Sequence, residues 1–278
     1  MKHPEIPDFT HFVATHQQRS ISVYCSGQGP TIVILPEIPG LHQQVFKLAR
    51  RITAAGFQVF LPALFGKVNA PFRSIDAAYE VARVCIRREF FLFASQKTSP
   101  MMNWVRDFCT DLHHQHGGQG IGLIGMCITG NFALSLLAEP WMLAPVLSQP
   151  SLPFGFRKQK TAALHVCPKL LKKGKERSDL QILGLRFSED IFCRPPRFAR
   201  LHQEFGERFT GIEIDSRPGN PYGIPPQAHS VLAVDFVDEE GHPTYSALQQ
   251  TLDFFRQRLL DTTKTEASGN PHDTPNRE

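Results

Sequence analysis

Short apolar runs rich in branched residues recur along the chain, and longer amphipathic stretches separate them. Each run covers six to eight residues and is bounded by proline, glycine or polar residues, which is typical of a buried strand. Strands that are apolar on both faces and alternate with helices favour a mostly parallel sheet. The predicted strands span residues 31–36, 57–62, 120–126, 143–148, 180–187 and 211–216.

Two of the intervening stretches have a clear helical period. Between the first two strands, apolar residues at i, i+3, i+4 and i+7 form one stripe, and Gly56 supplies a stop signal. Near the C-terminus a similar stripe follows Pro243, a residue that suits the first turn of a helix. The first stripe consists of Val45, Leu48, Ala49 and Ile52, and the second of Leu248, Leu252, Phe255 and Leu259.

These elements predict one α/β domain over residues 1–261, with a doubly wound, mostly parallel sheet and helices on both faces. The 278 residues are enough to build a single large core. Residues 68–100, rich in phenylalanine and arginine, interrupt the rhythm, and we interpret them as a cap or an elaborated crossover. The tail, residues 262–278, has almost no apolar anchor and is expected to be disordered.

The stretch from Gly120 to Leu134, GIGLIGMCITGNFAL, fits two different motifs. Its first three glycines spell the G-x-G-x-x-G of a dinucleotide-binding turn, which requires a strand before the glycines. The residues before Gly120 are LHHQHGGQ, which are too polar for a buried strand. The glycines instead fall before and within the apolar run, so a nicotinamide oxidoreductase is the weaker interpretation.

The second motif is a nucleophile elbow, a sharp strand-to-helix turn with a catalytic side chain at its tip. Cys127 occupies the tip, Gly125 leaves room on one side, and Thr129 is bulkier than the usual glycine on the other, although Gly130 follows. The N-terminus of the following helix would favour the Cys127 thiolate, and the backbone N–H of Ile128 would face a developing oxyanion. The alternative is an inert packing cysteine.

An elbow of this kind requires an acid and then a histidine from later loops. Asp190 lies just past the predicted strand 180–187 and His229 lies beyond the next strand, so Cys127, Asp190 and His229 come in the required order. Glu189 competes with Asp190 for the role of the acid. A structural, hydrogen-bonded histidine is the alternative for His229.

In these features the chain resembles the dienelactone hydrolase family of the α/β-hydrolase fold, from about residue 31 to residue 259. In that family a glycine-flanked cysteine works with a histidine and an aspartate, and a glutamate in an E-I-x-G setting contacts the thiol. The segment PEIPGL matches this setting, so the resemblance implies that Glu37 is that glutamate. It also implies that Ile38 and Ile128 donate the two oxyanion-hole N–H groups. The alternative for Glu37 is a carboxylate that compensates the dipole of the next helix.

The same resemblance implies two arginines that hold a substrate carboxylate. The position four residues after the histidine is Ala233, which makes dienelactone itself a doubtful substrate. For the other arginine we choose Arg88, within CIRREFFLF, although a surface ion pair would explain Arg88 equally well. We therefore expect a larger or less acidic ester or lactone, bordered by Phe90, Phe91 and Phe93.

Composition and charge give little indication of nucleic-acid binding, a metal site or a membrane segment. The formal net charge is +4, and much of the excess lies in KLLKKGKER, where no aromatic residues interleave to stack on bases, so a solvated face is the simplest interpretation. The six cysteines form no C-x-x-C pair, and only Asp111 accompanies the HHQH cluster at metal-ligand spacing, so we expect no metal site. No segment has the apolar length of a signal peptide or a membrane helix.

Together these features predict a hydrolase of small esters or lactones that uses neither a cofactor nor a metal. His229, oriented by Asp190, and Glu37 would generate the thiolate of Cys127, which forms a thioester that water then hydrolyses. A catalytically degenerate binding protein of the same fold is the main alternative. It is supported by the two departures from the family pattern, Thr129 in the elbow and Ala233 after the histidine. Free thiols favour the cytoplasm. We expect a monomer whose partner is its small-molecule substrate, with no affinity for nucleic acid or membranes.

Overall fold

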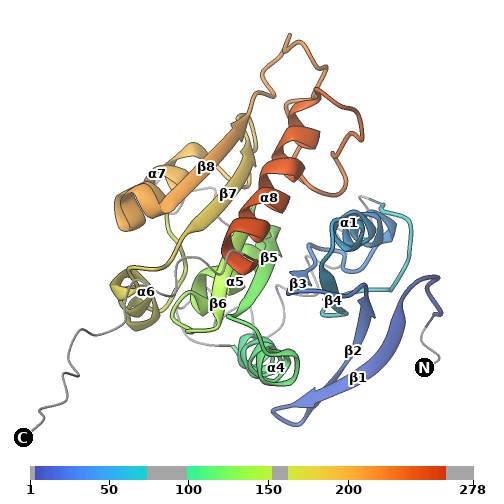
Figure 1. Cartoon of the computed structure of the whole chain (residues 1–278). Helices are drawn as coiled ribbons and strands as arrows, with labels where there is room; N and C mark the ends of the chain where they lie inside the picture. Colours follow the sequence, from blue (N-terminus) through green and yellow to red (C-terminus); the bar gives the residue numbers. More distant parts are fainter. Residues whose placement is uncertain (1–3, 74–98, 152–161, 261–278) are drawn as a thin grey trace, which may run out of the picture.

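The computed structural model describes residues 4–73, 99–151 and 162–260, which build one eight-stranded sheet (Figure 1). Its strands lie in the order β1-β2-β4-β3-β5-β6-β7-β8. The strands from β3 to β8 run parallel, whereas β1 and β2 form an antiparallel hairpin that joins the sheet through β4. The bounds are β1 (Thr10–His16), β2 (Arg19–Ser26), β3 (Thr31–Leu35), β4 (Gln58–Pro62), β5 (Ile121–Met126), β6 (Met142–Ser148), β7 (Ile182–Phe187) and β8 (Phe209–Ile214).

Helices cover both faces of this sheet (Figure 1). α1 and α8 pack on one face, and α4, α5 and α7 pack on the other, while α6 lies next to α5. This two-sided cover explains why the central strands are apolar throughout. The bounds are α1 (Gln43–Ala54), α4 (Pro100–His116), α5 (Gly130–Leu136), α6 (Pro168–Glu176), α7 (Pro195–Phe205) and α8 (Pro243–Leu259).

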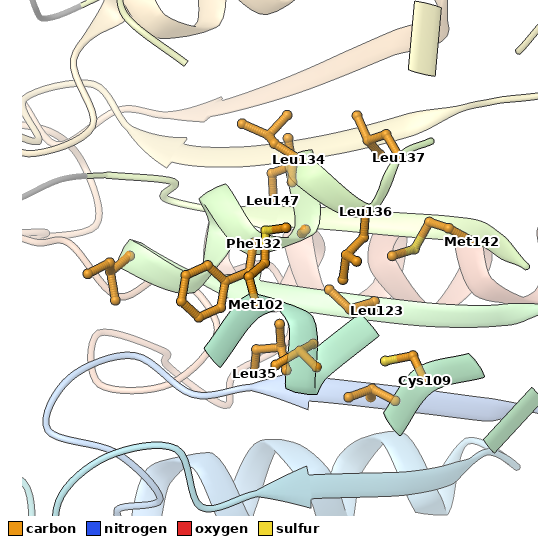
Figure 2. Packing of buried hydrophobic residues seen from close by; sticks show 14 of the residues in the cluster. Leu35, Met102, Cys109, Leu123, Phe132, Leu134, Leu136, Leu137, Met142 and Leu147 are labelled. Carbon is orange, nitrogen blue, oxygen red and sulfur yellow. The ribbon is translucent and has the colours of Figure 1, made fainter. Parts of the chain in front are cut away.

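Strand residues alternate between two apolar cores, because successive side chains of a strand point to opposite faces. In β3, Val33 and Leu35 belong to the core beneath α4 and α5, whereas Ile32 and Ile34 belong to the core beneath α1 and α8. Figure 2 shows part of the first core, where strand residues pack together with residues of α4 and α5, among them Leu35, Leu123, Leu147, Met102 and Phe132.

The predicted fold class is confirmed. The six predicted strands correspond to β3 through β8, with boundaries that differ by at most two residues, and both predicted apolar stripes are buried. The hairpin of β1 and β2 is missing from the prediction. Most of the predicted cap, residues 74–98, and the whole predicted tail, residues 262–278, lie outside the described residues.

The carboxyl ends of the parallel strands meet at one edge of the sheet. β3 has β4 on one side and β5 on the other, so the winding of the chain reverses here, and open α/β sheets bind ligands at such a point. The loops after β3, β5, β7 and β8 carry Glu37, Cys127, Asp190 and His229, respectively. The topology therefore assembles four predicted site residues along the same edge.

Candidate active site

Cys127 follows β5 directly and has a left-handed backbone conformation, with a φ of 55°. Such a conformation is strained for a non-glycine residue and is often found at functional sites. Gly125 makes the turn possible, because a Cβ atom at this position would lie only 2.5 Å from the carbonyl oxygen of Thr129. The absence of a side chain at Gly125 thus lets the strand turn sharply into the helical segment that starts at Cys127.

Thr129 replaces the glycine expected on the far side of the elbow, and the structure explains how it is accommodated. Its side chain is fully buried, and its Oγ1 accepts a hydrogen bond from the backbone N–H of Met126 at 2.8 Å. The same hydroxyl is within donating distance of two backbone carbonyls. That of Leu35 lies at 2.8 Å and that of Met126 at 2.9 Å. Thr129 therefore strengthens the turn and joins it to the end of β3.

His229 and Asp190 form a close pair at the same edge. The Nδ1 atom of His229 lies 2.7 Å from Oδ2 of Asp190, whose side chain is buried. The other carboxylate oxygen, Oδ1, accepts hydrogen bonds from the backbone N–H groups of Phe192 at 2.8 Å and Cys193 at 3.1 Å. Glu189, the alternative acid, is exposed. The structure thus directs Asp190, and not Glu189, toward the imidazole.

The loop that carries His229 is held by a carboxylate that sequence analysis missed. Oδ2 of Asp235 accepts hydrogen bonds from the backbone N–H groups of His229 at 2.9 Å and Ser230 at 2.8 Å. The ring of Phe192 packs edge-on against the imidazole, with 5.3 Å between ring centroids. An acidic residue six positions after the histidine is the signal that could have pointed to Asp235.

The electrostatics of the site connect the imidazole of His229 with the sulfur of Cys127. Burial is the largest single influence and lowers the pKa of His229, but the negative charge of the Cys127 thiolate and the hydrogen bond and charge of Asp190 outweigh it, so this pKa lies well above 6.5. The Nε2 atom of His229 is buried and has no oxygen or nitrogen partner among the described residues. The arrangement can therefore hold an imidazolium beside a thiolate.

Glu37 is 3% exposed and has several polar partners. Its Oε1 accepts a hydrogen bond from Oγ of Ser230 at 2.5 Å, and its Oε2 accepts one from Nε2 of Gln149 at 3.0 Å. Nε2 of His42 lies 3.4 Å from the same Oε1. The expected contact between Glu37 and the thiol is absent, because none of the described hydrogen bonds of Glu37 reaches Cys127, whose sulfur lies 3.1 Å from Oγ of Ser151.

Gln149 is a second residue that sequence analysis missed. It directly follows β6 and is fully buried. Its Nε2 donates to Glu37, while its Oε1 accepts from the hydroxyl of Ser148 and, at 3.4 Å, from the backbone N–H of Val231. Gln149 thus links the loop of Glu37 with the loop of His229. The signal was a buried polar residue at the end of an apolar strand.

A comparison with family models agrees with this geometry. The model of the dienelactone hydrolase family matches residues 19–259, which is most of the chain. The chain belongs to the dienelactone hydrolase family. It is thus a member of a hydrolase family with the α/β-hydrolase fold.

Solved structures share the fold at low sequence identity. A candidate dienelactone hydrolase from Klebsiella pneumoniae subsp. pneumoniae is 17% identical, with a TM-score of 0.61 and coverage of 90% of this chain and 98% of that one. A cold-adapted esterase from an Arctic intertidal metagenomic library is 11% identical, with a TM-score of 0.59 and coverage of 93% and 97%. The dienelactone hydrolase-like promiscuous phosphotriesterase P91 from metagenomic libraries is 14% identical, with a TM-score of 0.57 and coverage of 90% and 98%. No curated protein matches the chain.

The predicted oxyanion-hole donors are described by the structure, whereas most of the residues expected to bind substrate are not. Ile38 is buried three residues beyond β3, and Ile128 lies in the first helical turn after the elbow, where N–H groups have no intrahelical partner. Ala233 is buried in the core beneath α1 and α8. Arg88 lies outside the described residues, as do the phenylalanines expected to border the substrate, Phe90, Phe91 and Phe93.

The described residues do not support the dinucleotide-binding motif, a metal site at the histidine cluster or a membrane-spanning helix. Gly122 and Gly125 lie within β5, so the dinucleotide motif does not occupy a turn that leads into a helix. His113, His114 and His116 belong to the last turn of α4, and no group of three potential metal ligands converges in the part of the chain that the structure describes. Of the described helices, none has both the length and the apolar character needed to cross a membrane.

Proposed function

We propose that this member of the dienelactone hydrolase family cleaves small carboxylic esters or lactones, with Cys127 as its nucleophile. The observation that carries the proposal is the pairing of two features at one sheet edge. Cys127 stands at the tip of a strained elbow, and its thiolate raises the pKa of His229, which is itself held 2.7 Å from Asp190. This is the arrangement that nucleophilic catalysis by a thiolate requires.

In the proposed reaction His229 holds the proton of the Cys127 thiol, and the thiolate attacks the carbonyl carbon of the substrate. The N–H groups of Ile38 and Ile128 donate hydrogen bonds to the oxyanion of the tetrahedral intermediate. As the intermediate collapses, His229 protonates the departing alkoxide, and a thioester remains on Cys127. His229 then takes a proton from water, which attacks the thioester and regenerates the thiolate with release of the acid. Asp190 orients the imidazole throughout.

Glu37 is assigned a supporting role in the same proposal. Its carboxylate is buried, accepts hydrogen bonds from Ser230 and Gln149, and lies in the loop after β3, the strand that pairs directly with β5. A carboxylate in this position can accept a proton when a bound substrate displaces one of these partners. We therefore keep Glu37 as a second base for Cys127, acting in the substrate complex.

The proposed substrate class is an ester or lactone without a free carboxylate close to the reacting bond. The buried Ala233 occupies the position at which the family resemblance implies a carboxylate-binding arginine. The residues that follow Asp190, Ile191 and Phe192, are exposed and apolar, and Phe192 contacts the imidazole of His229. An apolar substrate group packed on this loop fits such surroundings better than an anion does.

A degenerate binding protein is the competing proposal, and Thr129 was one of its two supports. The hydroxyl of Thr129 points into the fold and hydrogen-bonds backbone groups of β3 and β5, so it leaves the elbow intact. Only the missing arginine at Ala233 still favours this alternative. Five described cysteines are free, which supports the further proposal that the protein works in the reducing cytoplasm.

The test replaces Cys127 with alanine and measures the turnover of p-nitrophenyl acetate and of a panel of uncharged lactones. We expect turnover to fall to the uncatalysed background, because no other side chain would supply the acyl-accepting sulfur. The half-buried Cys167, at the start of α6, provides a matched control, and Cys167→Ala is expected to keep wild-type turnover. Unchanged activity of Cys127→Ala would refute the proposal, and inactivity of the wild type on the whole panel would favour the binding protein.

A further inference from the structure

Ser151 is a buried serine to which the reaction above gives no role. It lies three residues beyond the end of β6 and is 1% exposed. Its Oγ is 3.1 Å from Sγ of Cys127, so its hydroxyl is within hydrogen-bond distance of the proposed nucleophile. A thiolate accepts hydrogen bonds and donates none, so in the ionised state the hydroxyl of Ser151 must be the donor.

The main chain holds Ser151 next to the elbow independently of its hydroxyl. The backbone N–H of Ser151 donates to the carbonyl of Cys127 at 3.0 Å. The carbonyl of Ser151 accepts from Nδ2 of Asn131 at 2.9 Å, and the same amide nitrogen lies 3.2 Å from the carbonyl of Ile128. Because these bonds involve backbone atoms of Ser151, removal of the hydroxyl leaves the loop in place.

The buried guanidinium of Arg197 contacts Asn131 and the residue before Ser151. The guanidinium of Arg197 is 3% exposed and donates to Oδ1 of Asn131 at 2.8 Å, to the carbonyl of Pro150 at 3.0 Å and to the carbonyl of Ala163. None of the described carboxylates pairs with it. A buried charge is costly unless other charges or dipoles compensate it. Burial lowers the pKa of Arg197, and the amide of Asn131 and the two backbone carbonyls supply the dipoles that compensate its charge.

We propose that Ser151 is a further catalytic residue of this hydrolase, whose hydroxyl donates a hydrogen bond to the Cys127 thiolate while Asn131 and Arg197 hold it in position. This inference rests on the proposed function. Ser151 transfers no proton. Its hydrogen bond stabilises the sulfur anion before attack, weakens when the sulfur becomes a neutral thioester, and re-forms when the sulfur leaves the second tetrahedral intermediate.

The experiment measures the reactivity of the sulfur directly, by alkylation of the full-length protein with iodoacetamide across a range of pH. Because the partly exposed Cys25 and Cys167 can also be alkylated, the modified residue is identified by mass spectrometry of peptides. For Ser151→Ala we expect alkylation of Cys127 at neutral pH to slow by about tenfold, the size typical of one hydrogen bond to a charged group. The midpoint of the pH profile should move to higher pH, a change that a purely structural serine would not produce.

Two further variants make this test specific. Ser151→Thr keeps a hydroxyl on the same backbone and is expected to restore most of the alkylation rate at neutral pH. Ser135 is a matched control, because it is also buried and its hydroxyl donates to the carbonyl of Asn131 at 3.1 Å without contacting the sulfur. Ser135→Ala should therefore keep the wild-type pH profile.

The outcomes separate this inference from the proposed function. An unchanged pH profile in folded Ser151→Ala, checked by circular dichroism, would overturn the role of Ser151 even if esters are still hydrolysed through Cys127. A shifted profile supports the role even if no ester of the panel is turned over, because alkylation requires no substrate chemistry. Equal shifts in Ser151→Ala and Ser135→Ala would also overturn it, since loosened packing would then explain both.

Discussion

Two carboxylate–imidazole pairs lie at the same edge of the sheet, and they differ in almost every physical respect. In the first, Asp190 and His229 approach to 2.7 Å, and the imidazole is coupled to the sulfur of Cys127. In the second, Glu37 and His42 approach to 3.4 Å, beyond the usual length of a hydrogen bond, and both side chains are almost completely buried. Proximity of an acid to a histidine therefore does not by itself produce a short hydrogen bond between them.

The difference originates in how each carboxylate uses its two oxygens. One oxygen of Asp190 accepts hydrogen bonds from two backbone N–H groups, which fix the plane of the carboxylate. The other oxygen is then free to accept a hydrogen bond from His229. Glu37 divides its oxygens between a hydroxyl and an amide, and His42 only approaches one of them. The first carboxylate orients an imidazole, whereas the second is itself held in place by its surroundings.

The largest expected effect comes from breaking the first pair with Asp190→Asn. The amide would donate to Nδ1 and so impose the wrong tautomer on His229, and we expect kcat for an activated ester to fall by about 10³-fold or more. Steady-state kinetics measure this loss. Glu189→Gln, at the exposed neighbouring carboxylate, is the matched control and should remain close to wild type. If the Glu189 variant lost activity and the Asp190 variant did not, the assignment of the acid would be reversed.

An intermediate effect is expected for Glu37→Gln. The amide keeps an acceptor oxygen for Ser230 but can no longer take a proton, so we expect kcat to decrease by about 10²-fold, as for the loss of a general base. The fold is monitored by thermal unfolding. His42→Asn serves as the control for the second pair, because it removes the imidazole and leaves the carboxylate in place, and it should change turnover little. Wild-type turnover by Glu37→Gln would remove Glu37 from the mechanism.

The smallest effect concerns the titration of His229 itself. Because the Cys127 thiolate helps to raise the pKa of His229, this pKa should be lower in Cys127→Ala, as measured by NMR titration of the imidazole. A folded-state pKa above the unfolded value of about 6.5 stabilises the fold fully below that value, and this stabilisation is lost as the pH rises through the folded-state pKa. Urea unfolding should show this loss ending at lower pH in Cys127→Ala. Identical titrations in the two proteins would mean that the imidazole is not coupled to the sulfur.

Sequence patterns predicted the parts of the molecule that depend on local order. The apolar runs identified β3 through β8 because these strands are buried on both faces, and the order of Cys127, Asp190 and His229 along the chain follows from the order of the loops. The hairpin of β1 and β2 escaped because β1 lies at the sheet edge, where most of its side chains are at least partly exposed and the apolar pattern is weak.

The partners of the site residues could not be predicted in the same way. Gln149 contacts Glu37 across 112 positions of sequence, and Asp190 contacts His229 across 39. Ser151 reaches the sulfur because β6 pairs with β5, and no spacing rule connects a serine to a cysteine 24 residues earlier. Such contacts depend on how strands are paired, which a single sequence specifies only through the complete fold.

The hydroxyl of Thr129 joins the turn after β5 to the last carbonyl of β3. The two N–H groups proposed to receive the oxyanion, on Ile38 and Ile128, belong to the two segments that this one bond connects. The distance between those donors would then be fixed by the frame of the sheet before any substrate arrives, and little reorganisation would be needed as charge develops. A hydrolase built in this way would tolerate wide variation in its peripheral loops, because the spacing of its two oxyanion-hole N–H groups is determined by the sheet and not by those loops.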